Sequence, residues 1–323
     1  MLKPKFKTLF FGTSSFAATC LKYLVGDFEV LAVVTQPDRP SGRGKHVTIS
    51  PVKDLALSLN IPVYQSEKIS RDLDMIDQLK SLKADIVAMV AYGQILRQNV
   101  LDICPFGVIN VHGSLLPAYR GASPVNWALI NGEKVTGVTT MQTEIGLDSG
   151  PIYLTQAVDI DNDIQADELK EILANVGGQL LVKTIHLLET DNIKPIPQDE
   201  GKVTLAPLLT KEMAIIDLNL SATSLHNRVR GLQPWPGVYF YLNNIRVKIL
   251  RTKLVNDYNL INQYKFKLGE IFKIKQKIYL GLLNNEVLEL VQLASENKKP
   301  TDALSWFNGL RVEPKVISSQ LIS

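Results

Sequence analysis

Short apolar runs alternate with amphipathic stretches through the first 190 residues of the chain. Residues 8–11, 30–34, 86–90 and 108–111 are buried-strand patterns of the expected length. Helical patterns run from Ser14 or Ser15 to about residue 25, over residues 51–59 and over residues 167–189. Strands that alternate with helices form parallel sheets with helices on both faces. The pattern therefore predicts an α/β fold, a Rossmann-like, doubly wound and mostly parallel sheet.

The pattern changes after residue 209. A helix is predicted over residues 221–230, followed by strands over residues 238–242, 245–253, 268–273, 277–282 and 286–293. Five short strands separated by turns favour a small β-barrel of the OB type. Residues 191–209 carry three prolines and little periodicity, which is typical of a linker. We expect a catalytic domain over 1–190, a linker over 191–209 and an OB-like domain over 210–323.

Charge divides the chain at a similar place. The first 206 residues hold 19 Lys and Arg against 23 Asp and Glu, a net charge of −4, whereas the remainder holds 16 against 9, a net charge of +7. A basic C-terminal third indicates a module that binds a polyanion, although a solvated lysine-rich surface is an equal alternative. The chain has 46% apolar and 21% charged residues, and its apolar runs are too short for membrane spans. The two cysteines fit a cytoplasmic protein.

Candidate chemistry gathers at the end of the strand over 108–111. Asn110 and His112 are two residues apart, so their side chains share one face of the strand. Asn donates hydrogen bonds to an oxyanion, His donates or moves a proton, and Asp148 can hold the imidazole charged and oriented. A lone Asn or His at a strand end is more often a turn residue. No serine or cysteine nucleophile elbow is present, which favours direct attack by an external nucleophile on a carbonyl.

The order Asn110, His112 and Asp148, with Ser114-Leu115-Leu116-Pro117 after the histidine, resembles the catalytic motif of the folate-dependent formyltransferases. The likeness extends along nearly the whole chain, through residues 11–13, 36–45, 50–53 and 233–237. The catalytic motif alone indicates a formyltransferase, and the stretch over 36–45 narrows the resemblance to the branch that acts on tRNA.

This resemblance implies transfer of a formyl group from 10-formyltetrahydrofolate to the α-amine of methionine on initiator methionyl-tRNA. The catalytic residues would be Asn110, His112 and Asp148, with no metal required and a monomer expected. The implied folate contacts are Ser114, Leu115, Leu116, Pro117, Tyr92, Gly93, Gln94 and Ile95. Plain core packing is the alternative for Leu115 and Leu116.

The resemblance also implies tRNA contacts, and the expected set is Arg39, Arg43, Lys45, Arg120, Lys248, Lys273 and Lys275. The loop from Arg39 to Lys45 would grip the acceptor end, with Arg43 as its leading residue, although a generic basic loop is the alternative. Lys273, Lys275 and Lys277 are expected to alternate along one strand face and to meet phosphates. Three positions differ from the family pattern. Ala118 stands where many family members carry a basic residue. Pro207 and Leu208 replace residues that are polar or charged in many family members.

Other functions fit the sequence less well. Gly12 lacks the glycine spacing of a dinucleotide fingerprint, and Thr35-Gln36-Pro37 follows the second strand where an acidic residue is needed. A sugar-nucleotide formyltransferase shares the catalytic motif but has no use for the basic loop and basic C-terminal part. A catalytically silent RNA-binding protein would not need intact Asn110, His112 and Asp148.

Overall fold

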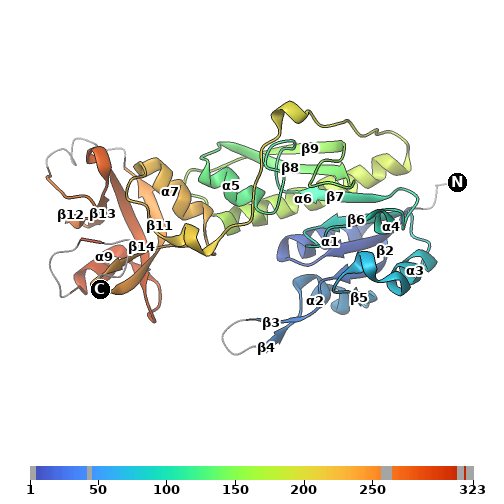
Figure 1. Cartoon of the computed structure of the whole chain (residues 1–323), viewed down its shortest axis with the longest axis horizontal. Coiled ribbons are helices and arrows are strands. Elements are labelled where there is room, and N and C mark those ends of the chain that lie inside the picture. Colours follow the sequence, from blue (N-terminus) through green and yellow to red (C-terminus); the bar gives the residue numbers. More distant parts are fainter. Residues whose placement is uncertain (1–4, 42–45, 256–263, 311–315, 318–323) are drawn as a thin grey trace. The chain divides into compact units, whose positions relative to one another are not determined.

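A computed structural model describes residues 5–41, 46–255, 264–310 and 316–317 (Figure 1). The chain divides into two compact units. The first unit comprises Met1–Gly121, Val135–Asp159 and Lys170–Ala206, and the second comprises Ala122–Lys134, Ile160–Leu169 and Pro207–Ser323. Two short segments that precede residue 170 therefore belong to the second unit.

A seven-stranded sheet forms the centre of the first unit, in the order β5-β2-β1-β6-β7-β8-β9. Its strands are β1 (Lys7–Gly12), β2 (Glu29–Thr35), β5 (Val63–Gln65), β6 (Ile86–Val90), β7 (Val108–His112), β8 (Val135–Gln142) and β9 (Ile152–Asp159). The pairs from β5 to β7 are parallel, whereas β8 and β9 join as antiparallel strands. A separate hairpin of β3 (Arg39–Ser41) and β4 (His46–Thr48) follows β2.

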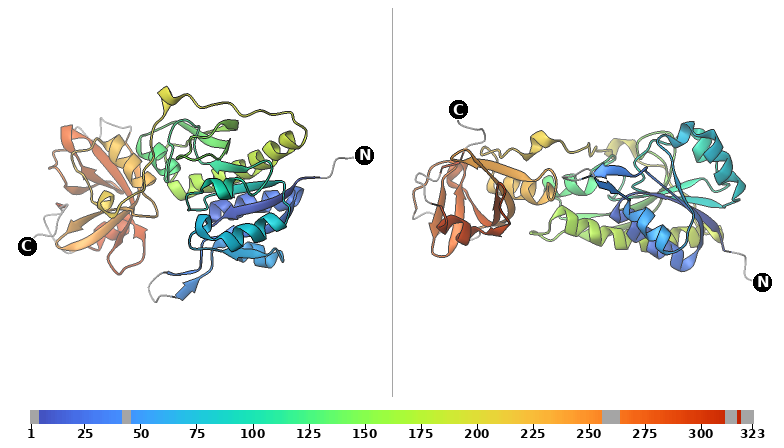
Figure 2. Two further views of the ribbon diagram at one scale, coloured as in Figure 1. Left: turned by 45° about the vertical axis from the view of Figure 1, so that its right-hand side comes forward. Right: turned by 90° about the horizontal axis from the view of Figure 1, so that it is seen from below.

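Helices cover both faces of this sheet (Figures 1 and 2). Their bounds are α1 (Ser15–Asp27), α2 (Pro51–Ser58), α3 (Leu73–Ser81), α4 (Gln98–Leu101) and α6 (Ala166–Glu189). Leu79 of α3 joins one apolar cluster with Phe11 and Val108 of the sheet. The α6 residue Gly177 lies against Val111, which points to the other side of β7. Alternate residues of one strand are thus buried under different helices.

The second unit is built on an antiparallel sheet in the order β10-β11-β14-β13-β12, with β15 beside β14. Its strands are β10 (Val238–Leu242), β11 (Ile245–Leu254), β12 (Ile271–Ile274), β13 (Lys277–Gly281), β14 (Val287–Ser295) and β15 (Thr301–Asp302). The unit also contains α5 (Pro124–Ile130), α7 (Ala222–Gly231) and α9 (Ala303–Asn308). One core cluster unites Leu225 of α7, Phe240 of β10 and Trp306 of α9.

The predicted fold class is confirmed, with a mostly parallel sheet in one unit and an antiparallel sheet in the other. The apolar pattern predicts neither β8 nor β9, because β8 contains a glycine and two adjacent threonines and β9 lacks strict alternation of apolar and polar residues. Residues 191–206 differ from a free linker: Ile196 exchanges backbone hydrogen bonds with Ile152, and Arg120 does so with Thr204 and Ala206. Tertiary backbone pairing orders this proline-containing segment.

Among the described residues, no helix is long and apolar enough to cross a membrane.

Candidate active site

Strand β7 presents Asn110 and His112 from one face at its carboxyl end. Both side chains are buried, with 8% and 6% exposed. They alternate with Val111, as the two-residue period of a strand requires. None of the described residues hydrogen-bonds the Asn110 side-chain amide, so its N–H groups are available to an oxygen that enters the site.

His112 has an oxygen acceptor at each ring nitrogen. Its Nε2–H donates to the Tyr119 carbonyl oxygen over 2.9 Å, and its Nδ1 lies 3.5 Å from the Asp148 Oδ2. Only the doubly protonated ring carries an N–H at both positions. The arrangement places the His112 ring beside the Asp148 carboxylate, and these two residues were predicted to lie together. For His112 to donate to a substrate, one of its N–H groups must exchange its present partner.

Asp148 lies in the loop between β8 and β9, far along the chain from β7. Its backbone φ is +49°, a left-handed conformation that is uncommon outside glycine. The Gly121 N–H donates to Oδ2 over 2.8 Å. A Cβ on Gly150 would lie 1.8 Å from the Gln142 carbonyl oxygen, so the loop returns to the sheet only with glycine at that position.

Several side chains of the predicted folate segment after β7 form hydrogen bonds or packing contacts within the protein. The buried Ser114 hydroxyl donates to the Ala118 carbonyl over 2.6 Å, and the Thr139 hydroxyl bonds the backbone of Ser114 and Leu116. The Leu116–Pro117 peptide bond is cis. Leu116 is buried and Leu115 is half-buried. Ser114 and Leu116 thus shape the loop, and any folate contact by their side chains stays a prediction.

The second predicted folate segment follows β6. The side chain of Tyr92 is 2% exposed and packs with Phe11 in the core, their ring centroids being 5.4 Å apart, so it cannot meet a ligand at the surface. Burial raises the pKa of this phenol. Gln94 is also engaged, because its amide bonds the backbone of Ser66 and Ile69. Gly93 has a φ of +86°, and Ile95 is 90% exposed.

The predicted tRNA residues of the first unit lie in different settings. Arg39 is exposed and ion-pairs with Glu67 at 3.3 Å. Arg43 and Lys45 lie outside the described residues. Arg120 is only 6% exposed, and its guanidinium binds Glu200 at 2.7 Å. A phosphate contact by Arg120 would require its ion pair with the exposed Glu200 to open.

Basic residues of the second unit follow β11 and the β12–β13 hairpin. Val247, Ile249 and Thr252 are buried, and a bulge near Arg251 shifts the register with β14. Lys248 and Lys253 are exposed and Arg246 and Arg251 are half-buried. Arg251 ion-pairs with Glu168 and, with Lys253, lines a cavity beside α7.

The expectation that Lys273, Lys275 and Lys277 alternate along one strand is wrong. Lys273 lies in β12 and Lys277 is the first residue of β13. Lys275 lies in the turn between the two strands, with a φ of +54°. The chain reverses there, because Ile274 pairs directly with Lys277. Lys273 and Lys275 are exposed, and Lys277 ion-pairs with Glu289 at 2.8 Å.

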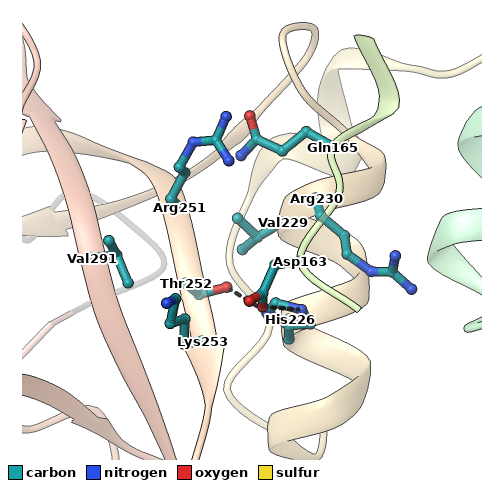
Figure 3. Close-up of a pocket in the computed structure, with 9 residues that line it drawn as sticks. All are labelled: Asp163, Gln165, His226, Val229, Arg230, Arg251, Thr252, Lys253 and Val291. Atoms are coloured by element: carbon teal, nitrogen blue, oxygen red, sulfur yellow. Dashed lines mark hydrogen bonds and ion pairs between the residues drawn. The ribbon is translucent and has the colours of Figure 1, made fainter. Parts of the chain in front are cut away.

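A small cavity of about 40 Å³ lies in the second unit, between α7, β11 and the segment before α6 (Figure 3). His226 lines it with 2% exposure. Its Nε2–H donates to the Asn162 carbonyl over 2.8 Å, and Nδ1 lies 2.9 Å from the Thr252 hydroxyl. Burial lowers the pKa of His226, and the nearby Arg230 acts in the same direction. This histidine is therefore held as a neutral hydrogen-bonding bridge.

Comparison with known proteins agrees with these features. Residues 5–185 match the formyl transferase family model, and residues 208–311 match the formyl transferase C-terminal domain. The chain therefore belongs to the formyl transferase family, in its methionyl-tRNA formyltransferase branch. Methionyl-tRNA formyltransferase of Clostridium novyi (strain NT) is 42% identical over 307 residues, covering 95% of this chain and 98% of the relative. The corresponding protein of Clostridium perfringens (strain 13 / Type A) is 43% identical over the same shares.

Solved structures with lower sequence identity share the fold. WlaRD, a sugar 3N-formyl transferase crystallised with dTDP and 5-N-formyl-THF, aligns with a TM-score of 0.66 at 17% identity, over 92% of this chain and 100% of that chain. An N-formyltransferase from Helicobacter canadensis, in complex with folinic acid and dTDP-3-aminofucose, aligns with a TM-score of 0.66 at 16% identity, over 89% and 99%. The predicted family is thus confirmed, and these structures support the fold.

Sequence reasoning missed two groups beside the predicted catalytic residues. The Tyr119 carbonyl is a backbone atom without any side-chain signal. Gln198 donates to the carbonyl oxygens of Asp148 and Gly150 at 2.8 and 2.7 Å, yet it lies in a segment predicted to be a linker. No local pattern identifies a glutamine that acts some 50 residues away.

Proposed function

We propose that the protein transfers the formyl group of 10-formyltetrahydrofolate to the α-amine of methionine on initiator methionyl-tRNA, for the initiation of translation. The observation that carries the proposal is the juxtaposition of Asn110, His112 and Asp148 in a chain about 42% identical to methionyl-tRNA formyltransferases. The α-amine attacks the formyl carbon directly, and negative charge develops on the formyl oxygen.

The three side chains have separate roles in this reaction. Asn110 donates to the developing oxyanion from an amide that is already unpaired within the described residues. His112 adds a second donor when its N–H exchanges the Tyr119 carbonyl for the formyl oxygen. Asp148 keeps the ring charged and accepts the proton that the attacking nitrogen loses, directly or through water. N10 of the folate takes up a proton as the C–N bond breaks, so the transfer is balanced.

The folate is proposed to lie against the loops that follow β6 and β7. Gly93 and Ile95 offer backbone and apolar surface in the first loop, and Leu115 and Pro117 offer apolar surface in the second. The tRNA is proposed to meet Arg39, Arg43 and Lys45 near its acceptor end, and the exposed lysines of the second unit along its phosphates. The protein is proposed to act as a monomer in the cytoplasm, where charged tRNA is formylated.

A direct assay tests this function. Purified protein is given 10-formyltetrahydrofolate labelled in the formyl group, with methionyl-tRNA in one reaction and an amino-sugar nucleotide in another. We expect label on the methionine and none on the sugar. Transfer to the sugar alone, or no transfer to either acceptor, contradicts the proposal.

Two variants connect the assay to the site. Removing one oxyanion donor typically costs about 10²–10³ in rate, so Asn110→Ala and His112→Ala should each lower kcat by at least about 100-fold. His186→Ala is the matched control, because His186 is a partly exposed histidine on α6. A near-normal kcat for His112→Ala removes that residue from the mechanism.

A further inference from the structure

The three consecutive residues Tyr119, Arg120 and Gly121 connect the parts of the candidate site. The Tyr119 carbonyl accepts from His112, and the Gly121 N–H donates to Asp148. Arg120 lies between these contacts and points its guanidinium to Gln198 and Glu200. The segment therefore contacts both His112 and Asp148, and through Arg120 it also contacts Gln198 and Glu200.

The side-chain amide of Gln198 is fully used. Its Nε2 donates to the carbonyl oxygens of Asp148 and Gly150 at 2.8 and 2.7 Å. Its Oε1 accepts from Nε and Nη2 of Arg120 at 3.0 and 2.9 Å. Because a guanidinium only donates and a carbonyl only accepts, one orientation of the amide satisfies all four contacts.

Arg120 holds Gln198 in that orientation. The Arg120 side chain is 7% exposed, and a buried cation needs a charged partner and filled hydrogen-bonding positions. Glu200 supplies the charge through two oxygen atoms at 2.7 and 3.2 Å, and Gln198 fills the remaining side of the fork. The backbone of Arg120 is fixed as well, because it pairs with Thr204 and Ala206.

The loop that carries Asp148 needs such a support. A non-glycine residue at a φ of +49° is strained, and strained backbone persists only where its surroundings fix it. The two hydrogen bonds from Gln198 hold the loop backbone at Asp148 and Gly150, on either side of Ser149. Together with the Gly121 N–H they determine where the Asp148 carboxylate stands relative to His112.

We propose that Gln198 is a positioning residue, which, held by Arg120, fixes the Asp148 loop and so sets the His112–Asp148 pair. The inference rests on the proposed formyl transfer. Misplacement of a catalytic group by about 1 Å can cost roughly 100-fold in rate, so the amide contributes to kcat without touching substrate.

The test variant is Gln198→Glu. Glutamate still pairs with Arg120, but its carboxylate has no N–H for the two carbonyls and repels them. We expect kcat to fall by about 10- to 100-fold, with KM for each substrate within about two-fold. The pH dependence of kcat should shift, and hydrogen exchange should quicken in residues 143–151. Gln156→Glu is the matched control, since this exposed glutamine of β9 also donates to a backbone carbonyl.

A double-mutant cycle separates positioning from general structural support. In an Asp148→Asn background, measured by single turnover, Gln198→Glu should cost little further rate, because the residue acts through Asp148. Equal losses in both backgrounds, or an unchanged kcat and pH profile, overturn the inference. If Gln198→Glu does not fold, Arg120→Lys replaces it in the same double-mutant cycle. This substitution keeps the positive charge but removes the two guanidinium N–H groups that bind Gln198. An inactive wild-type protein contradicts the proposed function instead.

Discussion

At the scale of single residues, two buried histidines differ in the partner of Nδ1. His112 has the Tyr119 carbonyl oxygen at Nε2 and the Asp148 carboxylate at Nδ1. His226 has the Asn162 carbonyl and, at 3.8 Å, the Asp163 carboxylate at Nε2, whereas the Thr252 hydroxyl lies at Nδ1. A hydroxyl that donates to Nδ1 requires the neutral ring. The same side chain thus has a carboxylate beside Nδ1 in one unit and a hydroxyl there in the other.

The neutral state of His226 predicts a pH-dependent stability. Its folded pKa is below the ordinary value of 6.5 because of burial, then the charges of Arg230 and Lys134, while the Asn162 carbonyl and Asp163 oppose the shift. The unfolded chain therefore takes up the proton first as pH falls. The contribution to stability is complete above about pH 6.5 and is lost below it, by at most about 1.4 kcal/mol per pH unit.

Urea unfolding followed by tryptophan fluorescence measures this effect, since all three tryptophans, Trp127, Trp235 and Trp306, belong to the second unit. His226→Gln should be less stable at pH 7.5 but should lose less stability between pH 7 and pH 5. His186→Gln is the control and should keep the wild-type slope. A His226→Gln slope equal to that of wild type would refute the assignment.

At the scale of elements, the loop between β8 and β9 is specified by close backbone approach. A Cβ on Gly150 would lie 1.8 Å from the Gln142 carbonyl oxygen, whereas a Cβ on Gly26 in α1 would meet nothing within 4 Å. Glycine is therefore sterically required at position 150 but not at position 26. The first permits the loop to reach the sheet, and the second only weakens a helix.

Alanine substitutions distinguish the two positions. Gly150→Ala must push the loop away from β8, so we expect kcat to fall by roughly 100-fold as Asp148 moves. Gly26→Ala should leave kcat unchanged and raise stability by up to about 1 kcal/mol. Steady-state kinetics and thermal unfolding of both variants provide the comparison. Wild-type kcat in Gly150→Ala would show that the loop position is not critical.

At the scale of the whole molecule, charge is distributed unevenly along the chain. Residues 1–206 carry a net charge of −4 and residues 207–323 one of +7. Truncation at Pro207 is a poor test of the basic part, because residues 122–134 and 160–169 belong to the same compact unit. They would lose their partners. Charge substitutions in the full chain avoid this problem.

Lys248 and Lys273 are exposed and, within the described chain, form no ion pair. The double variant Lys248→Gln/Lys273→Gln should raise the Kd for tRNA and flatten its dependence on salt by roughly one unit of slope per lost phosphate contact. kcat at saturating tRNA should stay the same. Lys80→Gln/Lys183→Gln, on exposed helix positions of the first unit, is the control. Equal salt slopes for both variants and wild type would exclude these lysines as phosphate contacts.

The sequence by itself determined the elements whose periodicity is strong, because burial of one face dictates where apolar residues recur. It predicted β6 and β10 at their observed bounds and α6 within one residue at its start. It also predicted that Asn110 and His112 lie together, since residues two apart share a strand face in any register.

Only the tertiary structure decided how these side chains are held. Arg120 was expected to meet tRNA, yet the fold buries its side chain and pairs it with Gln198 and the exposed Glu200. Residues 191–206 read as a linker, yet backbone pairing with Arg120 and Ile152 orders them. The physical reason is common to both: a hydrogen bond between residues far apart in the chain leaves no periodic trace in the sequence. Local pattern records which face is buried, whereas the fold alone selects the partner of each buried polar group.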